Sequence, residues 1–148
     1  MLTLKEALSE QELADSKEIE RMIFDEEQGK NDAYAAFEAG DITRLIMYDG
    51  EKAVATGQLC FDGEYFMIGR VAVVSANRGN GLGDFVMRCL IRRAFDMGGE
   101  DVYINASEEV RGFFEKLGFK PVSKPLEKSF ATRVLMKRSG DIGGNCGL

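Results

Sequence analysis

The sequence predicts one α+β domain, which can equally be classed as α/β, built on a mixed sheet with helices on its faces. Three observations lead to this prediction. The chain has 148 residues, 45% of them hydrophobic, which is enough for one domain with its own core. Two Asp-Gly pairs separate three strand-like runs, a strong signal for β-hairpins. Strand-like and helix-like segments then alternate, which adds strand–helix–strand units.

The N-terminal half is expected to begin with a short strand over residues 2–7. Ser9 and Glu12 form an S-x-x-E capping box, which predicts a helix running to about Glu27. A second short helix is expected over 32–39. The three hairpin strands are predicted over residues 43–48, 53–61 and 65–74.

Beyond a glycine-rich turn, apolar residues recur at helical spacing until the Met-Gly-Gly of residues 97–99 ends the helix. A strand over 101–106 and a helix over 108–117 follow, and Gly118 closes that helix. The domain itself is expected to cover residues 1–138. The remaining expected segments are strands over 119–122 and 130–137 and a mobile, Gly-rich tail over 139–148.

Charge and residue usage exclude several classes of function. The net charge of −6 makes a poor partner for nucleic acid or an anionic membrane, and it permits a cationic substrate. No apolar run approaches the roughly 20 residues of a membrane span, and the first residues lack a signal-peptide pattern, so a cytoplasmic location is expected. The chain has no histidine, which excludes Ser-His-Asp and Cys-His catalysis as usually built.

The three cysteines, Cys60, Cys89 and Cys146, are odd in number and widely spaced. This pattern fits neither a disulfide framework nor a zinc site, and we expect no metal. Cys60 and Cys89 fall on strand-like and helix-like segments, so core packing is expected for both.

The turn before the long helix contains three glycines within five residues. Glycine loses more backbone entropy on folding than any other residue, so the presence of three glycines in one turn calls for an explanation. The first-turn N–H groups of a helix have no intrahelical partner and carry partial positive charge, and glycines let a phosphate approach them. The spacing is not the G-x-G-x-x-G of dinucleotide sites, and no G-K-[ST] of a P-loop is present. The turn reads Arg78-Gly79-Asn80-Gly81-Leu82-Gly83.

The pattern R-x-x-G-x-G over 78–83 resembles the pyrophosphate loop of the GNAT superfamily of acyl-CoA-dependent N-acetyltransferases. Two further stretches support the resemblance. "VRGFFEKLGFKPV" (110–122) resembles the family's A-x-x-F-Y-E-K-L-G-F, and "IERMIFDEEQGK" (19–30) is similar to the R-x-x-V-F-x-x-E-Q-G of a branch of small bacterial enzymes. The resemblance covers most of residues 1–138. It implies a mixed, mostly antiparallel sheet of six to seven strands with helices on both faces.

The resemblance implies acetyl-CoA as acyl donor. In the family, the strand before the loop splays from its neighbour and pairs with the pantetheine arm. The backbone of Val71, Ala72 and Val73 would do so here, and an N–H near Val73 would polarise the thioester carbonyl. The side chains of Val71 and Val73 can pack in the core at the same time. The amides from Arg78 to Asp84 would hold the pyrophosphate, which the Arg78 side chain could also contact. The other implied cofactor contacts are Asn105, Ser107 (where the family more often has Asn or Gln) and Phe114.

The resemblance also implies direct transfer, in which a base takes the amine proton and an acid protonates the leaving thiolate. The family's acid is the Tyr of F-Y-E-K, and this chain has Phe114 there. Water, Tyr65 or Tyr103 remain as proton donors. Glu27, in the E-Q-G-like stretch, is the first candidate for the base, and the alternative is a surface glutamate. Arg133 stands where this branch often has a His, and it is a candidate for binding an anionic group on the acceptor.

Three functions therefore remain open. The first is an N-acetyltransferase acting on a small primary amine, and the second is a weakly active or non-catalytic CoA-binding module, which the missing tyrosine favours. The third is a structural domain without a cofactor, in which the glycine turn is only a turn. A homodimer is an expectation by analogy with the family.

Overall fold

The computed structural model describes residues 1–23, 41–106, 108–122 and 134–140. Within these residues seven strands form one sheet in the order β1-β2-β3-β4-β5-β7-β6. Neighbouring strands are antiparallel except for β4 and β5, so the predicted mixed, mostly antiparallel sheet is confirmed. The strands are β1 (Leu2–Glu6), β2 (Asp41–Asp49), β3 (Lys52–Phe61), β4 (Phe66–Val73), β5 (Asp101–Ala106), β6 (Lys120–Pro121) and β7 (Val134–Ser139).

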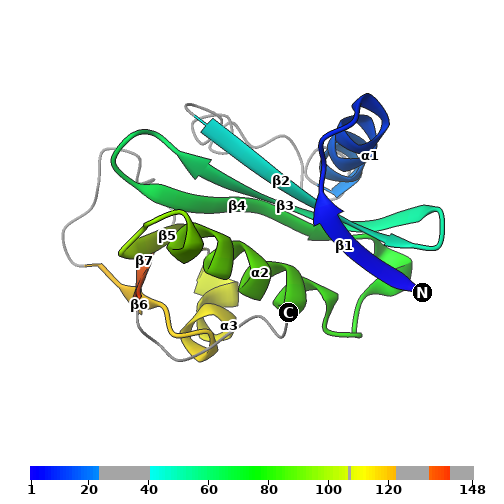
Figure 1. Ribbon diagram of the computed structural model, residues 1–148. Coiled ribbons are helices and arrows are strands. Elements are labelled where there is room, and N and C mark those ends of the chain that lie inside the picture. Colours follow the sequence, from blue (N-terminus) through cyan, green and yellow to red (C-terminus); the bar gives the residue numbers. More distant parts are fainter. Residues whose placement is uncertain (24–40, 107, 123–133, 141–148) are drawn as a thin grey trace.

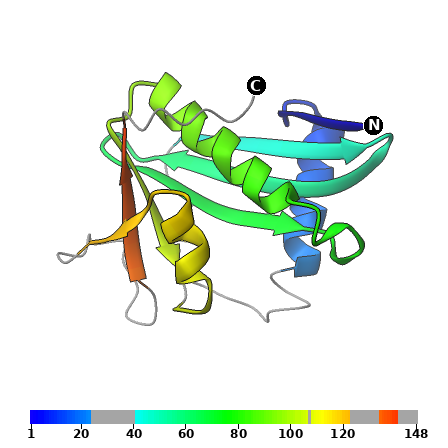
Figure 2. The same cartoon turned by 90° about the horizontal axis from the view of Figure 1, so that it is seen from below.

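Helices cover both faces of the sheet, as predicted (Figures 1 and 2). Helix α1 (Glu10–Glu20) lies on one face, and α2 (Leu82–Asp96) and α3 (Arg111–Lys116) lie on the other. Two short 3-10 turns, η3 (Ser75–Asn77) and η4 (Glu108–Val110), precede α2 and α3.

Helix α1 begins with the predicted capping box. The Ser9 hydroxyl accepts a hydrogen bond from the Glu12 N–H at 3.1 Å, and the Glu12 carboxylate accepts one from the Ser9 N–H at 3.0 Å. The Lys5 ammonium and the N–H groups of Ser9 and Leu8 lower the pKa of Glu12 to about 2, because each favours the charged carboxylate. Residues 24–40 lie outside the described residues, and the end of the predicted first helix and the whole of the second fall there.

Both hairpins lie where the Asp-Gly pairs predict them. In the first, Asp49 pairs with Lys52, and the two-residue loop begins at Gly50, whose φ is +62°. In the second, the Asp62 carboxylate accepts hydrogen bonds from the N–H groups two and three residues later. Tyr65 therefore lies in this turn and not in the strand that was predicted to begin there.

The C-terminal strands differ from the prediction at their ends. The predicted strand over 119–122 shortens to β6 because the Phe119 N–H donates to the Phe114 carbonyl and so belongs to the turn that closes α3. Strand β7 includes Ser139, and the Gly140 N–H donates to the Glu100 carbonyl at 2.6 Å. Residues 123–133 and 141–148 lie outside the described residues.

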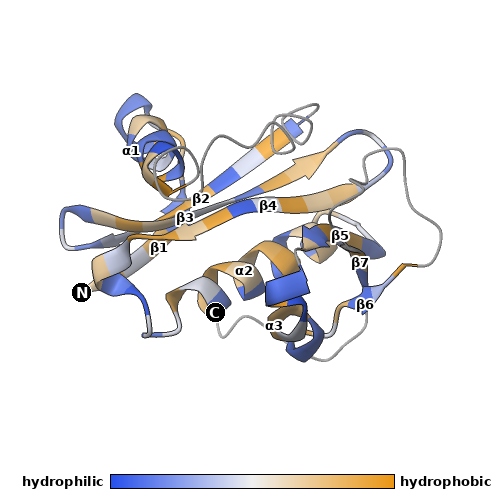
Figure 3. Ribbon diagram, turned by 180° about the vertical axis from the view of Figure 1, so that it is seen from behind, coloured by the Kyte–Doolittle hydropathy of each residue, from blue (hydrophilic) through white to orange (hydrophobic). Residues whose placement is uncertain are grey.

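The main core lies between the sheet and α2, and apolar residues run along β3 and β4 between the two helix layers (Figure 3). Cys60 and Cys89 are each 5% exposed, which confirms their expected core packing, while Cys146 falls outside the described residues. A smaller cluster packs under α1 on the opposite face. The α2 side of the core is made by Leu82, Val86, Met87, Cys89, Leu90, Ile91 and Ala94.

We predict that Gly57→Ala lowers the free energy of unfolding by about 1–3 kcal/mol. A Cβ on Gly57 of β3 would lie 2.7 Å from Leu90 Cδ1 and 2.9 Å from Val86 Cγ1, so α2 would have to move. Urea unfolding measures the change. Gly112→Ala in α3 is the control, since its Cβ would meet nothing within 4 Å. Equal stability of the two variants would contradict close packing of α2 on β3.

Candidate functional site

The glycine turn connects the end of β4 to the start of α2. Gly81 is the N-cap residue of α2 with φ +76°, and Gly79 has φ +87°. These left-handed values favour glycine, which accounts for two of the three glycines. A Cβ at either position would meet nothing within 4 Å, so the space above the turn is open to solvent or to a ligand.

Gly83 needs a different explanation. It lies inside α2, and a Cβ there would make an ordinary contact of 3.7 Å with Val73 Cγ2. Neither the backbone nor the packing of the described residues requires glycine, and alanine would favour the helix by about 1 kcal/mol. A glycine that the fold does not require is consistent with close approach of a ligand.

The first turn of α2 presents backbone N–H groups. Gly81 makes no side-chain cap, and the Phe85 N–H donates to the Gly81 carbonyl at 3.0 Å. The amides of Leu82, Gly83 and Asp84 precede this first helical bond and so have no partner within the helix. The Asp84 carboxylate accepts a hydrogen bond from Arg88 at 2.8 Å. The turn thus offers donors and the positive end of a 15-residue helix dipole.

Strands β4 and β5 pair at their first residues and then diverge (Figure 2). Phe66 pairs with Val102 and Met67 with Tyr103, and the register between these two strands goes no further, although β4 continues to Val73. The splay implied by the family resemblance is therefore confirmed. It opens toward the end of β4 that leads into the glycine turn.

A β-bulge lies on β4 three residues beyond Met67, the last residue that pairs with β5. Arg70 and Val71 of β4 oppose the single residue Gly57 of β3, and Arg70 has φ +52°, unlike any other non-glycine residue of the described chain. Such a conformation costs about 1–3 kcal/mol and persists where its surroundings impose it. From Val71 onward, Val71 and Val73 pack against the α2 core and Ala72 packs under α1. Core packing of the two valine side chains is therefore confirmed, and β5 does not pair with their backbone.

A buried carboxylate lies beside the bulge. Glu20, the last residue of α1, is 4% exposed and accepts a hydrogen bond from the Gln58 amide. Its oxygens lie 3.8 Å from Arg70 Nη1 and 3.9 Å from Arg44 Nε. Glu20 was not among the site residues predicted from the sequence. A signal existed, because aligning 19–30 on E-Q-G places the motif's leading Arg at this glutamate.

The Arg78 side chain stabilises the glycine turn by a hydrogen bond to the backbone. Its Nε–H donates to the Val73 carbonyl at 2.9 Å, and the Asn80 side chain donates to the Asn77 carbonyl at 3.5 Å. The guanidinium was expected as a possible phosphate contact, and its Nε–H is used to tie the turn to the last residue of β4.

The residues expected along the pantetheine arm lie on β5 and α3. Asn105 Nδ2 is 3.8 Å from the sulfur of Met67 on β4, so this side chain reaches across the two strands. Phe114 is half-buried against the main core, and its ring contacts those of Phe113 and Phe119 with centroids 5.3 and 6.0 Å apart. Three expected residues, Ser107, Glu27 and Arg133, lie outside the described residues.

Tyr65 and Tyr103, the reserve proton donors, lie together at the beginning of β4 and β5. Their rings meet edge to face at 5.4 Å. A hydrogen bond with Glu64 raises the pKa of Tyr65, and burial raises the pKa of Tyr103, so both hydroxyls are protonated at neutral pH. The eight residues of β4 that follow Tyr65 span about 26 Å, which sets Tyr65 well away from the glycine turn.

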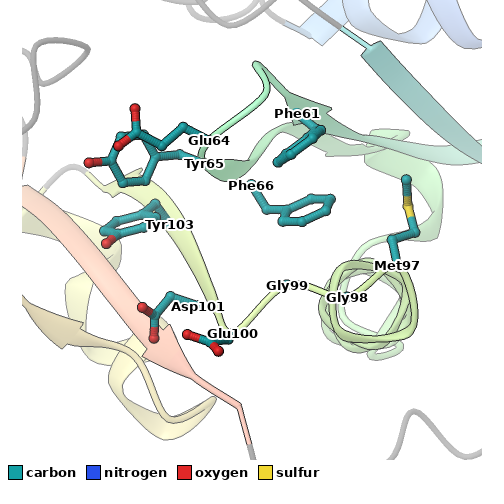
Figure 4. Close-up of a pocket in the computed structure, with 10 residues that line it drawn as sticks. All are labelled: Phe61, Glu64, Tyr65, Phe66, Met97, Gly98, Gly99, Glu100, Asp101 and Tyr103. Atoms are coloured by element: carbon teal, nitrogen blue, oxygen red, sulfur yellow. The ribbon is translucent and has the colours of Figure 1, made fainter.

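A pocket of about 300 Å³ lies beside these tyrosines (Figure 4). It is bounded by the β3–β4 turn, the start of β5 and the connection from α2, at the opposite end of β4 from the glycine turn. It therefore does not belong to the candidate cofactor site. The lining residues are Phe61, Glu64, Tyr65, Phe66, Met97, Gly98, Gly99, Glu100, Asp101 and Tyr103.

The part of the chain that the structure describes lacks two other kinds of site. No group of three or more His, Cys, Asp or Glu residues there could hold a metal ion. None of the helices described is both long and apolar enough to cross a membrane.

A family model described as an acetyltransferase (GNAT) domain matches residues 5–139. The chain belongs to the GNAT acetyltransferase family. An uncharacterized N-acetyltransferase of Bacillus subtilis, YjcF, is 28% identical to this GNAT protein over 125 residues, which cover 84% of the chain and 87% of that relative. The match with the family model includes β4, the glycine turn and α2.

Solved structures show the same fold. An acyl-CoA N-acyltransferase from Pseudomonas aeruginosa superposes with a TM-score of 0.77 at 24% identity, covering 94% of this chain and 99% of that one. The PaiA N-acetyltransferase from Thermoplasma acidophilum, solved in complex with coenzyme A, gives 0.71 at 13% identity, covering 94% and 99%. The seven-stranded sheet is thus the GNAT fold.

We predict that Arg78→Met speeds amide hydrogen exchange in the glycine turn about 2- to 10-fold, which corresponds to loss of one hydrogen bond of about 0.5–1.5 kcal/mol. The substitution removes the Nε–H that the Val73 carbonyl accepts. Arg92→Met is the control, because Arg92 pairs with Asp96 at the far end of α2. Identical exchange in the turn of both variants would show that Arg78 does not brace it.

Proposed function

We propose that this protein is an N-acetyltransferase that moves an acetyl group from acetyl-CoA to the primary amine of a small acceptor by direct transfer. The observation that carries the proposal is the parting of β4 from β5 beside a glycine turn that opens the N-terminus of α2. Membership of the GNAT family supports the chemistry, and the coenzyme A complex of PaiA supports the donor.

The described residues fit the pyrophosphate and the pantetheine arm of an acyl-CoA donor. Amides without an intrahelical partner suit a pyrophosphate, and the space beside Gly79 and Gly81 is open. Residues 71–73, which begin in the bulge, have backbone that β5 does not pair, which suits a pantetheine arm lying beside them like an added strand.

Each part of the site then has a proposed task. Acetyl-CoA supplies a thioester whose carbonyl carbon is attacked by the neutral amine, so that a C–N bond forms and the C–S bond breaks with its electron pair on sulfur. The backbone of Val71, Ala72 and Val73 aligns the arm, and an N–H near Val73 polarises the carbonyl. The amides of residues 79–84 hold the pyrophosphate, and Arg78 keeps the turn in shape. Asn105, Ser107 and Phe114 line the arm.

Proton transfer uses residues on the acceptor side. Glu27 is the proposed base that takes the amine proton. Phe114 cannot donate a proton to the leaving thiolate, and a thiol pKa of roughly 8.5 makes that thiolate stable enough for water to protonate it. The proposed acceptor is a small amine, and Arg133 is the proposed partner of an anionic group on it.

A second function is favoured by one observation, the phenylalanine at position 114. Loss of a general acid typically lowers a rate by about 10²–10⁴. The alternative is therefore a protein that binds acyl-CoA and transfers weakly or not at all.

Thermal unfolding with and without acetyl-CoA tests donor binding. At about 100 times Kd, a ligand that binds the native state adds roughly 2.7 kcal/mol, which is a rise of several degrees in Tm for a domain of this size. Adenosine is the control ligand and should give little shift. Absence of a shift at saturating acetyl-CoA would exclude both proposed functions. A shift would justify screening small amines for thiol release.

We predict that Gly83→Ala raises the Tm of the unliganded protein and weakens acetyl-CoA binding on the order of tenfold, or about 1.4 kcal/mol. The methyl group favours the helix by up to about 1 kcal/mol and covers the amides that bind the pyrophosphate. Isothermal titration calorimetry and thermal unfolding measure the two effects. Gly112→Ala is the matched helix control and should leave binding unchanged. Unweakened binding in Gly83→Ala would argue against an approach of phosphate at this residue.

We predict that Phe114→Tyr raises kcat by about 10²–10⁴ if the native protein merely lacks its acid, with little change in the Kd for CoA. Thiol release from acetyl-CoA measures the rate once an acceptor is found. Phe113→Tyr on the neighbouring exposed ring is the matched control. No gain in an enzyme that is already active would mean that water or another residue protonates the thiolate.

A further inference from the structure

The last residue of α1 carries a buried charge that the proposed chemistry does not use. Glu20 is 4% exposed, and a carboxylate taken out of water needs hydrogen bonds and opposite charge around it. The Gln58 amide donates to it, and the guanidinium groups of Arg44 and Arg70 lie within 4 Å. Those two arginine side chains are 14% and 22% exposed, so they are partly buried around the carboxylate.

This carboxylate connects one helix to three strands. Arg44 lies on β2, Gln58 on β3 and Arg70 on β4, and Arg44 stands directly opposite Gln58 in the register of β2 and β3. Glu20 thus joins α1 to the strand that carries the candidate cofactor backbone.

Glu20 contacts β4 at Arg70, the residue with positive φ. Arg70 has φ +52° and belongs to the two-against-one bulge opposite Gly57. On the α2 face, Leu90 and Val86 lie so close to Gly57 that a Cβ there would clash with both. On the α1 face, the ion pair with Glu20 holds the Arg70 side chain. The bulge is therefore fixed from both sides of the sheet.

We propose that Glu20 is a positioning residue for the acyl-donor strand. By holding Arg70 it keeps the bulge formed, and the bulge keeps Val71, Ala72 and Val73 turned away from β5 with their backbone open to the donor. The effect on donor affinity rests on the proposed function. The effect on the strand itself does not.

Glu20→Gln tests this role because it keeps the size of the side chain and removes its charge. We expect amide hydrogen exchange over residues 70–74 to speed up about tenfold, and the Kd for CoA to rise about 5- to 10-fold. The matched control is Ser16→Ala. Ser16 lies one turn earlier on the same face of α1, is fully buried, and shares a 2.6 Å hydrogen bond with Thr56 of β3. The Ser16→Ala substitution weakens the packing of the same helix and leaves the contact with Arg70 in place.

Arg70→Gly tests whether Glu20 acts on the strand through Arg70. Glycine adopts positive φ without strain, so the bulge no longer depends on an ion pair. Glu20→Gln should then add less than a twofold change in exchange over 71–74 in the Arg70→Gly background. Glu20→Asp retains the charge on a shorter side chain and is expected to lie between wild type and Glu20→Gln, which covers the case that Glu20→Gln fails to fold.

The outcomes separate this proposal from the proposed function. If the wild-type protein does not bind CoA while exchange over 70–74 responds to Glu20→Gln and not to Ser16→Ala, the proposed function fails and the role of Glu20 in the strand stands. If both variants change exchange and Kd equally, Glu20 merely stabilises α1 and the inference is overturned. An equal effect of Glu20→Gln in the wild-type and Arg70→Gly backgrounds overturns it as well.

Discussion

Only two residue pairs join β4 to β5, so most of the β5-facing edge of β4 is left unpaired by β5. The rest of the candidate site depends on this unpaired edge. On its other edge β4 is paired with β3 along most of its length, so its position is fixed from one side. Backbone groups in a sheet need partners, and an edge that its neighbour leaves unpaired accepts another extended chain. The same strand leads through the glycine turn into α2. One strand therefore positions both an extended edge and a set of helix N-terminal amides.

Contacts on both faces of the sheet surround the bulge of β4. Gly57 allows α2 to approach closely on one face, because any side chain there would meet Leu90 and Val86. Glu20 brings charge to Arg70 on the other face. Packing and electrostatics thus act on a single bulge, and a left-handed arginine persists where both act together.

Phe114, in place of tyrosine, affects the proposed acid catalysis but not the proposed binding of the donor. Its ring packs against the core and against Phe119, so the position serves the fold whether or not transfer occurs. The amides and the parted strands require no tyrosine. A GNAT protein with this residue can retain a donor site while the proton for the leaving thiolate comes from elsewhere, and this is why binding and turnover are separate questions for this chain.

The sequence by itself determined the features that depend on neighbouring residues. These are the capping box at Ser9, the two Asp-Gly hairpins, the glycine turn and the helix after it, because each rests on local hydrogen bonds or backbone freedom. The roles of Glu27, Ser107 and Arg133 stay predictions. The parting of β4 from β5 was expected only through the family resemblance, and the structure confirmed it. Only the tertiary structure decided that Arg70 adopts positive φ and that Glu20 is buried. A charged residue at a helix end is usually solvated, and a bulge at Arg70 has no glycine to mark it, so both depend on contacts between segments far apart in the chain.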